Sequence, residues 1–379
     1  LQYLNINKVV FFTGVPHHYD TSLLSISSHL LNIQQVFLYS QVIEGRLVIL
    51  DMSLGLSKRF LLDVPVSSYD STNAINDFIS NRDQGKQPKS NTKQAFWKKS
   101  YIIAIIVIFY LYFRRGLKKL INIHYEKPWA EINSNIGLFQ EISIINKQKK
   151  YIKTYAQNLN RMLKKNEKQP VKLIIAAHYQ PEATSHPEGG DCPDHIEIAL
   201  TLRSKGYVGE LFYKEHSASY FYIDNIIGPT RVGLHRSRDY YETLESLGCI
   251  LMSKDFDLSL EELKCEWYVP VTISGTIAIE RSLKGLHTII TGEPWFKDIP
   301  GAVSLKDIKS LKEIDTDWAS PNNMIAKSAK EYLQSVLSYK SILNFPGIGS
   351  GVKLFDNDQK FLFLKEFDNL MVMLEEENE

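Results

Sequence analysis

The sequence predicts an α/β protein of two domains, each built on a parallel sheet with helices on its faces. Apolar strands and helices alternate with short turns from residue 171 to about residue 304, which is typical of a doubly wound, Rossmann-like domain. A strand, a helix and a second strand also follow one another near the N-terminus, and this order favours a parallel pair. The length of 379 residues suits two domains better than one.

In the first domain, KVVFFTG (8–14) is predicted to be a buried strand with a turn, and QVFLYS (35–40) is the next strand. A helix is expected between them, from about Thr21 to Leu31. RLVILDM (46–52) adds a further strand. Residues 81–94 are polar and contain Gly and Pro, which predicts a surface loop.

The domain boundary is predicted after residues 141–168, a charged helix that ends in KKNEKQP, because Pro170 closes this linker. Two later helices, at about 322–342 and 357–375, are expected to pack back on the first domain. The chain is therefore divided into an N-terminal domain, a second domain and C-terminal helices, at 1–168, 169–320 and 321–379.

The second domain is predicted to alternate five strands with four helices. The strands are expected at 171–177, 209–214, 249–252, 268–273 and 287–290, and the helices at 194–204, 238–247, 258–264 and 276–284. No G-x-G-x-x-G motif is present, so the sequence does not support NAD binding.

Residues 101–113, YIIAIIVIFYLYF, carry no charge and have basic residues on both sides. A helix that spans a bilayer needs about 20 apolar residues, so this run is too short to cross one. A buried core helix or strand is one interpretation. A peripheral membrane contact over 101–119 is the other, because cationic residues beside an exposed apolar helix attract anionic head groups.

The charges are balanced, with 44 Lys and Arg against 43 Asp and Glu and a formal net charge of +1. No overall attraction to nucleic acid is therefore expected, and a phosphate ligand would have to be held locally. The hydrophobic fraction of 44%, with 20 Tyr and 18 Phe, fits a folded protein. The chain begins without Met or a signal-peptide pattern, so a longer parent protein is one interpretation.

The three cysteines form neither a CxxC pair nor an even set, which argues against a disulfide framework and a zinc ribbon. A reducing cytosol is the simplest setting for such a chain. His186, Cys192 and His195 lie close in sequence, but their spacing matches no known zinc site. We therefore expect no metal and no resident cofactor.

Two strands of the second domain are followed by clusters of polar residues. HYQPE comes after the first strand, and KEH comes at the end of the next one. Open parallel sheets bind ligands at the carboxyl ends of their strands, so these side chains are candidates for a site. They are His178, Glu182, Lys214, Glu215 and His216. For His178 the alternative is a satisfied buried histidine, and for Glu182 a helix cap or a loop salt bridge.

The turn Ser274-Gly275-Thr276 follows another apolar strand and begins a helix that carries Glu280. Unpaired N–H groups at a helix start can hold an anion, which makes this turn a candidate phosphate seat. Plain capping is the alternative for the turn, because Ser and Thr cap many helices. The alternative for Glu280 is an ordinary exposed helix residue.

The loop after the first strand of the chain, GVPHHYD, carries His17, His18 and Asp20. Its position at a strand end makes contact with an acceptor substrate or assistance in catalysis one interpretation. A structural or merely exposed pair of histidines is the other.

Four segments follow one another along the second domain: HYQPEATSHPEGG, the strand ending in YKEH, RSRDYYETL, and TISGTIAIE followed by Gly285 and Pro294-Trp295. Together these segments resemble the capsule polysaccharide biosynthesis family. The resemblance covers about residues 170–300, and the motifs in this order are more specific than any one of them. Characterised members are Kdo transferases, which use CMP-activated 3-deoxy-octulosonic acid in the assembly of bacterial surface glycans.

The resemblance implies a GT-B-like fold, in which two Rossmann-like domains face a cleft. It also implies glycosyl transfer from a CMP-activated donor to a glycan or lipid-linked acceptor. A carboxylate near the anomeric carbon serves as base in an inverting reaction or as nucleophile in a retaining one, and the resemblance implies the latter. Glu182 is the first candidate, with Asp191 and Asp194 in reserve. No DxD-like motif stands nearby, which favours metal-independent transfer.

Lys214 and His216 would supply positive charge and donors for the CMP phosphate or the donor carboxylate. Glu215 would point elsewhere, toward a ribose hydroxyl or a partner cation. Arg236 or Arg238 would clamp a carboxylate, unless both are surface charges. The 274–276 turn would then seat the phosphate, and Glu280 would hold the ribose.

Two other interpretations stay open. One is a transferase for another nucleotide donor, such as a CDP-linked polyol phosphate. The other is a non-catalytic glycan-binding or lipid-binding module that keeps the fold and docks through residues 101–113. The expected setting is the cytoplasm, with a contact at the inner face of the cytoplasmic membrane.

Overall fold

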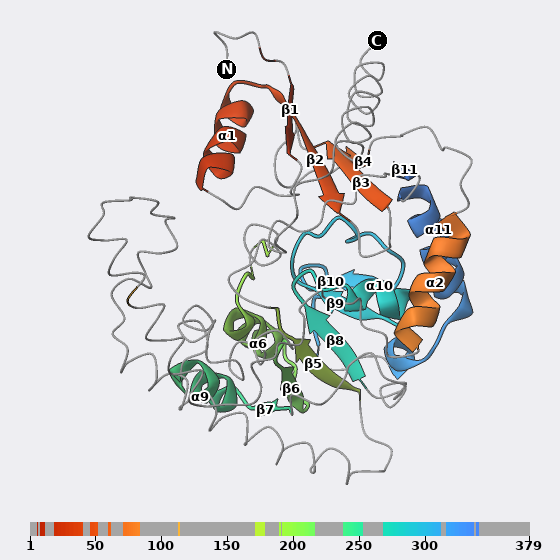
Figure 1. Cartoon of the computed structure of the whole chain (residues 1–379). Coiled ribbons are helices and arrows are strands. Elements are labelled where there is room, and N and C mark those ends of the chain that lie inside the picture. The colour runs from red at the N-terminus through yellow and green to blue at the C-terminus, as the bar shows by residue number, and fades with distance from the viewer. Residues whose placement is uncertain are drawn as a thin grey trace.

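The computed structural model contains two sheets with helices packed against them (Figure 1). It describes residues 6, 8–11, 19–40, 46–51, 60–61, 71–83, 113, 171–178, 189–190, 192–216, 238–252, 268–311, 316–336 and 339–340.

In the described part of the chain, the larger sheet has six parallel strands in the order β10-β9-β8-β5-β6-β7. From β5 the chain adds β6 and β7 on one side, and it then crosses back to place β8, β9 and β10 on the other. This is the strand order of a doubly wound, Rossmann-like sheet. The strands are β5 (Lys172–Ala176), β6 (Leu211–Lys214), β7 (Cys249–Leu251), β8 (Tyr268–Thr272), β9 (Thr288–Ile290) and β10 (Ala302–Ser304).

Helices cover both faces of this sheet. Helices α6 (His195–Ser204) and α9 (Arg238–Ser246) pack on one face, and α10 (Ile277–Ser282) packs on the other. Successive side chains of a strand point to opposite faces. Accordingly Ile289 joins the core under α6 and α9, whereas Ile290 joins the core under α10. The α/β class expected from the alternating pattern is confirmed.

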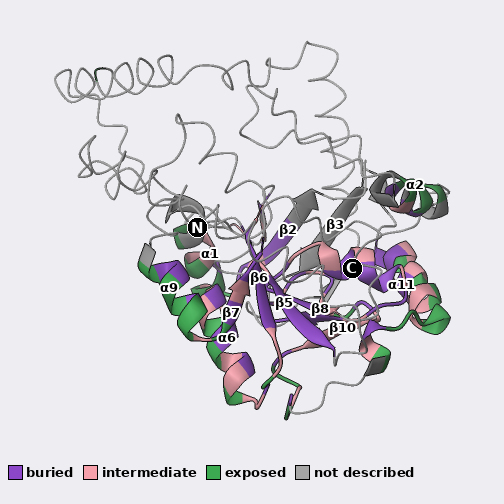
Figure 2. Cartoon of the chain, turned by 90° about the horizontal axis from the view of Figure 1, so that it is seen from below, coloured by how far each residue is buried: buried purple, intermediate pink, exposed green. Residues whose placement is uncertain are grey.

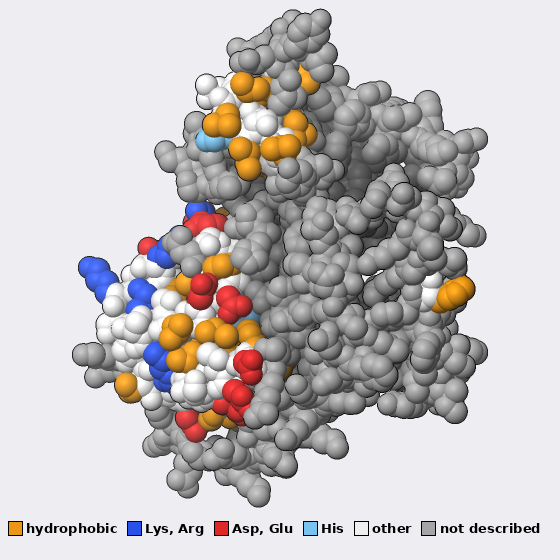
Figure 3. Space-filling model, turned by 90° about the vertical axis from the view of Figure 1, so that its left-hand side faces the viewer, with side chains coloured by type: hydrophobic (Ala, Val, Ile, Leu, Met, Phe, Trp, Pro, Cys, Tyr) orange, Lys and Arg blue, Asp and Glu red, His pale blue; other side chains and the backbone are white. Residues whose placement is uncertain are grey.

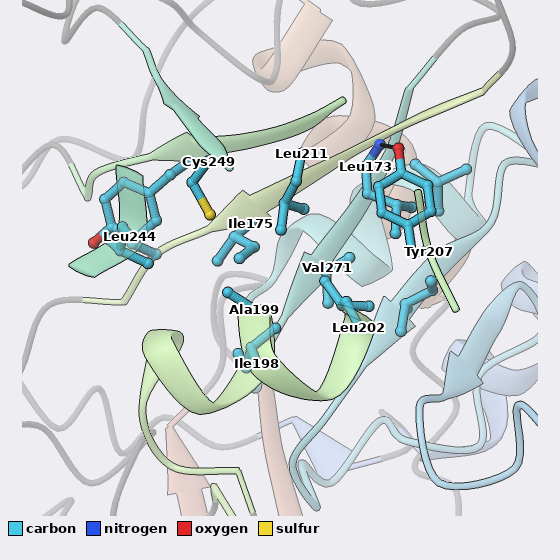
Figure 4. Close-up of a cluster of buried hydrophobic side chains, with 14 of the residues drawn as sticks. Leu173, Ile175, Ile198, Ala199, Leu202, Tyr207, Leu211, Leu244, Cys249 and Val271 are labelled. Atoms are coloured by element: carbon cyan, nitrogen blue, oxygen red, sulfur yellow. Dashed lines mark hydrogen bonds between the residues drawn. The ribbon is translucent and has the colours of Figure 1, made fainter. Parts of the chain in front are cut away.

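The core under α6 and α9 is formed by aliphatic side chains of the sheet and of the two helices (Figure 4). Its sheet residues are fully buried, as the central strands in Figure 2 show. Tyr207 closes one end of this core, where its hydroxyl accepts a hydrogen bond from the Leu173 N–H at 3.0 Å and donates one to the Glu210 carbonyl at 2.8 Å. Such a buried hydroxyl is stable only because both of its bonds are made.

Local sequence signals explain where the helices begin and end. Asp194 caps α6, since its Oδ1 accepts a hydrogen bond from the Ile196 N–H at 2.7 Å. After α10, Gly285 has a φ of 76°, and the Leu286 N–H donates to the Arg281 carbonyl at 2.9 Å. This is the Schellman pattern, in which glycine adopts the left-handed conformation that ends a helix.

Burial in this core also makes stability sensitive to alkaline pH. It raises the pKa of the Cys249 thiol to about 12 and the pKa of Tyr207 to about 12. Between the ordinary pKa values, about 8.5 for Cys and about 10 for Tyr, and these raised values, the unfolded chain loses protons that the folded chain keeps. The free energy of unfolding should therefore fall as pH rises above about 8.5, by up to about 1.4 kcal/mol per pH unit for each group.

Urea unfolding of the chain and of Cys249→Ala, between about pH 8 and pH 10, measures this effect. We expect the variant to lose most of the decline below about pH 10, where only the thiol of this pair titrates. An equal decline in both proteins would contradict the assignment to Cys249.

The smaller sheet is mixed. Its strands run in the order β1-β2-β3-β11, and β4 pairs with β3. Among the strands that the structure describes in this sheet, only β1 and β2 are parallel, joined by α1, whereas β4 and β11 both run antiparallel to β3. The elements are β1 (Lys8–Phe11), α1 (Tyr19–Leu30), β2 (Gln34–Ser40), β3 (Arg46–Asp51), β4 (Phe60–Leu61), α2 (Ser71–Asp83) and β11 (Tyr339–Lys340).

The expectation of a second Rossmann-like sheet is therefore met only in the β1-α1-β2 unit of the described residues. Strand β3 pairs with β2 in the antiparallel sense, because residues 41–45 are too few for the crossover that a parallel neighbour needs. The predicted surface loop at 81–94 is also wrong at its start, since α2 continues to Asp83. Residues 84–94 lie outside the described residues.

The two sheets are joined by a shared core. Phe11 and Phe37 stack with their ring centroids 4.8 Å apart, and they pack in one cluster with side chains of α2, α10 and α11 (Asn323–Val336). Helices α2 and α11 lie side by side in Figure 1. After α11 the chain continues to β11, so the predicted helix at 322–342 is too long at its C-terminal end. The predicted helix at 357–375 lies outside the described residues.

Helix α1 carries apolar side chains on its outer surface. Leu23, Ile26 and Leu30 are more than half exposed and lie on one face of the helix, where Figure 3 shows a group of hydrophobic side chains. Among the described helices, none has the length and apolar character needed to cross a membrane. Residues 101–112 lie outside the described residues, and Phe113 is exposed.

Candidate functional site

The candidate site lies at the carboxyl edge of the larger sheet, between β5 and β8. The chain leaves β5 toward β6 on one side of the sheet and reaches β8 on the other, so the loops after these two strands diverge at this point. Such a topological switch point is where open α/β sheets bind their ligands. His178 follows β5, and the 274–276 turn follows β8.

His178 connects the two strand ends. Its Nε2 accepts a hydrogen bond from the Ser274 N–H at 3.1 Å and lies 3.0 Å from the Thr272 hydroxyl. The Nε2 atom must be unprotonated to accept from an N–H group, which assigns this nitrogen from its bonding. The buried imidazole therefore holds the turn after β8 against the end of β5.

The 274–276 turn uses two of its N–H groups within the protein. The Ser274 N–H is bound by His178, and the Gly275 N–H donates to Thr272 Oγ1 at 3.2 Å. A side chain at position 275 would lie 2.5 Å from that hydroxyl, so glycine is needed for this close approach. The candidate phosphate seat thus has fewer open amides than the sequence predicts.

Helix α10, which follows this turn, is short. Thr276 occupies its N-cap position without a side-chain capping bond, and Glu280 in the first turn is half-buried. Arg281 is buried and donates to the His287 carbonyl at 2.9 Å and the Tyr268 carbonyl at 3.0 Å. Burial lowers the pKa of Arg281 to about 10, so this guanidinium remains charged at neutral pH.

At the end of β6, Lys214 and Glu215 are buried and His216 is half-buried. The Lys214 ammonium donates to the Glu215 carbonyl at 3.0 Å. The Glu215 carboxylate accepts from the Tyr213 and Tyr241 hydroxyls, both at 3.0 Å, and from the His216 N–H at 2.9 Å. The carboxylate expected to face a ribose is thus held by three donors of the protein itself.

The structure adds residues that the sequence analysis did not assign to the site. His195, at the start of α6, is fully buried; its Nε2 accepts from the His178 N–H at 2.9 Å, and its Nδ1 lies 3.0 Å from the Tyr240 hydroxyl. Tyr240 in turn lies 3.2 Å from the Tyr213 hydroxyl. In the sequence, the two adjacent tyrosines of RSRDYYETL at a predicted helix start were the signal that could have indicated these buried partners.

Three other predicted residues lie at the starts of helices. Asp194, a reserve nucleophile, is the N-cap of α6. Asp20 lies in the first turn of α1, because that helix begins two residues earlier than predicted, and Arg238 is the first residue of α9. The remaining predicted residues lie outside the described residues: Glu182, Asp191, Arg236, His17 and His18.

Among the described residues, no three His, Cys, Asp or Glu side chains gather in a way that could hold a metal ion. Cys192 instead lies 3.8 Å from the Thr201 hydroxyl, and His195 belongs to the buried group described above.

Comparisons of the chain with family models, curated proteins and solved structures find no match.

Proposed function

We propose that this chain is a glycosyltransferase that moves Kdo, or a related 2-keto acid sugar, from a CMP-activated donor to a surface glycan or glycolipid. The observation that supports this proposal best is the switch point of the parallel sheet, where His178, Ser274 and Gly275 meet. A nucleotide is the kind of ligand that binds at such a switch point. The motifs after β5, β6 and β8 supply the resemblance that specifies the sugar.

Transfer from a CMP-sugar breaks the bond between the anomeric carbon and the phosphate, so positive charge develops on the sugar and negative charge on the leaving nucleotide. The enzyme has to stabilise both charges. In our proposal the Glu182 carboxylate attacks the anomeric carbon and displaces CMP, while His216 and Lys214 stabilise the leaving phosphate. An acceptor hydroxyl then attacks the same carbon, releases the carboxylate and loses its proton to water. His178 would orient the turn after β8 on which the nucleotide rests.

Arg238 and Glu280 take donor-binding roles in the same proposal. Arg238 begins α9, the helix that also provides Tyr240 and Tyr241. A guanidinium there suits the carboxylate that distinguishes a 2-keto acid sugar from neutral sugars. His17, His18 and Asp20 are proposed to contact the acceptor, and residues 101–119 the membrane that presents a lipid-linked acceptor.

Binding and hydrolysis of CMP-Kdo by the purified chain test this function. We expect Glu182→Gln to lower CMP release at least about a hundredfold with CMP affinity retained, since it removes only the reacting carboxylate. His216→Ala should weaken CMP binding about tenfold or more, the effect of losing one charge-assisted hydrogen bond.

Each alternative gives a different result. A CDP-linked polyol phosphate that binds and turns over in place of CMP-Kdo would replace the donor. Glycan or lipid binding that Glu182→Gln leaves intact, with no turnover of any nucleotide donor, would indicate a non-catalytic module. A chain that binds no cytidine nucleotide would overturn the proposal.

A further inference from the structure

A continuous chain of hydrogen bonds runs beneath the carboxyl edge of the larger sheet. It starts at the His178 N–H and passes through His195, Tyr240 and Tyr213 to the Glu215 carboxylate, with successive distances of 2.9, 3.0, 3.2 and 3.0 Å. All five residues are buried. The chain therefore connects the exit of β5 with the exit of β6 through groups of α6 and α9.

The bonds fix the direction of every donor in this chain. His195 Nε2 accepts from an N–H group, so a neutral ring carries its proton on Nδ1 and donates it to the Tyr240 hydroxyl. Tyr213 donates to Glu215, so it accepts from Tyr240. Each donor along this path therefore faces an acceptor, and the last acceptor is the Glu215 carboxylate.

Packing holds the same groups in place. The His195 ring stacks on the His178 ring, with an interplanar angle of 8° and centroids 6.4 Å apart, and meets the Tyr213 ring edge-on at 5.9 Å. Tyr213 also meets Tyr240 edge-on at 6.2 Å. Rings packed in this way have little freedom to turn away from their hydrogen-bond partners.

We propose that His195 is a positioning residue, whose bonds to the His178 amide and to Tyr240 couple the exit of β5 to the exit of β6. The effect of this coupling on donor binding rests on the proposed function, because the exits of β5 and β6 carry the residues that the proposed function assigns to the nucleotide and the sugar. The coupling itself is a property of these buried hydrogen bonds and needs no ligand.

The two ends of this path of hydrogen bonds explain why it consists of polar groups. One end holds the main-chain N–H of His178, and the other holds the main-chain N–H of His216 through Glu215 Oε1 at 2.9 Å. Apolar side chains would fill the same volume without the desolvation that buried polar groups require. Polar groups are needed here because main-chain amides that leave a strand have to be bonded and aimed.

Two neighbouring tyrosines provide a matched test. Tyr240→Phe removes the hydroxyl that joins His195 to Tyr213, whereas Tyr241→Phe removes a hydroxyl that bonds Glu215 from outside this path. Both residues are buried on α9. Amide hydrogen exchange at His178, taken as a ratio to exchange at Ile174 in the preceding strand β5, then reports the local coupling and not global stability.

We expect the ratio at His178 to rise about fivefold in Tyr240→Phe, the effect of one neutral hydrogen bond, and to stay within about twofold in Tyr241→Phe. A His178 ratio unchanged in Tyr240→Phe, or raised equally in both variants, would overturn the proposal. In the unsubstituted chain, nitrogen-detected NMR should find the His195 proton on Nδ1, with the signal assigned by its loss in His195→Gln. A proton on Nε2 would also overturn it.

CMP titration of the same proteins keeps the two proposals separate. If the unsubstituted chain binds CMP, Tyr240→Phe should weaken binding by more than Tyr241→Phe does. If the unsubstituted chain binds no CMP, the proposed function fails, while exchange at His178 and the His195 proton position still decide the positioning role.

Discussion

Gly285→Ala is expected to lower the free energy of unfolding by roughly 3–5 kcal/mol, at the upper end of single substitutions. Gly285 has a φ of 76°, a conformation that strains any residue with a Cβ. An added Cβ would also lie 2.7 Å from the Asn322 nitrogen and 2.8 Å from its carbonyl carbon. These are main-chain atoms, which cannot rotate away.

The clash cannot be relieved locally because Asn322 is itself fixed. Its N–H donates to the Gly285 carbonyl at 2.9 Å, and its Oδ1 accepts from the Met324 N–H at 2.8 Å, which caps α11. Moving Asn322 would therefore disturb the start of α11, the helix that packs on α2 and connects the two sheets.

Gly248→Ala is the matched control, because Gly248 has nearly the same φ, 74°, and also follows a helix. Its nearest atom to an added Cβ is Arg203 Nη2 at 3.0 Å, a side-chain atom whose guanidinium also donates to the Leu247 carbonyl at 3.0 Å. We expect a loss of about 1–2 kcal/mol there, chiefly from backbone strain, because a side chain can shift where main-chain atoms cannot. Urea unfolding of both variants measures the difference, and equal losses would show that the contact with Asn322 carries no energy.

Much of the larger sheet could be predicted from the sequence because its signals are local. The strands and helices from residue 171 to residue 290 that the structure describes begin and end within about two residues of their predicted bounds. Short apolar runs, an Asp cap at position 194 and glycines after helices determine these bounds without tertiary information. Strand β10 was not predicted, since its residues are only half-buried and carry little apolar signal.

The smaller sheet was harder to predict because strand direction depends on connections and distant partners. The run at 46–52 was recognised as a strand, but its antiparallel pairing with β2 and with β11, far along the chain, does not follow from local pattern. Strand β11 has two residues, and it exists only because β3 offers an edge to pair with.

The candidate site divides in the same way. The strand ends at His178 and Glu215 and the close turn at Gly275 could be predicted from their positions after apolar runs. Their partners could not, since His195 and Tyr240 lie 17 and 45 residues from the atoms they bond. The direction of a side chain at a strand end is decided by such partners. Because Tyr241 lies 26 residues from Glu215, the sequence indicated a ribose hydroxyl or a partner cation for this carboxylate and not a tyrosine.

Glu215→Ala is expected to lower the free energy of unfolding by roughly 3–5 kcal/mol, because it removes the acceptor of two buried hydroxyls and of one half-buried N–H group. These are the Tyr213 and Tyr241 hydroxyls and the His216 N–H, around a carboxylate that is 1% exposed. Glu215→Gln keeps the shape and one acceptor oxygen but turns a donor toward another donor, so about 1–2 kcal/mol is expected. Glu331→Ala, at an exposed pair with Lys327, should change stability by less than about 0.5 kcal/mol.

The Gln variant also separates a structural carboxylate from one that binds a ribose. If the Glu215 carboxylate accepted a hydrogen bond from a ribose hydroxyl, Glu215→Gln would bind the nucleotide more weakly. Its free energy of unfolding would stay near that of the unsubstituted chain. The hydrogen bonds within the protein predict the reverse, a clear loss of stability with any loss of CMP affinity following from a displaced His216 amide. Urea unfolding and CMP titration of Glu215→Ala and Glu215→Gln therefore decide whether Glu215 binds the ligand itself or positions His216, which binds it.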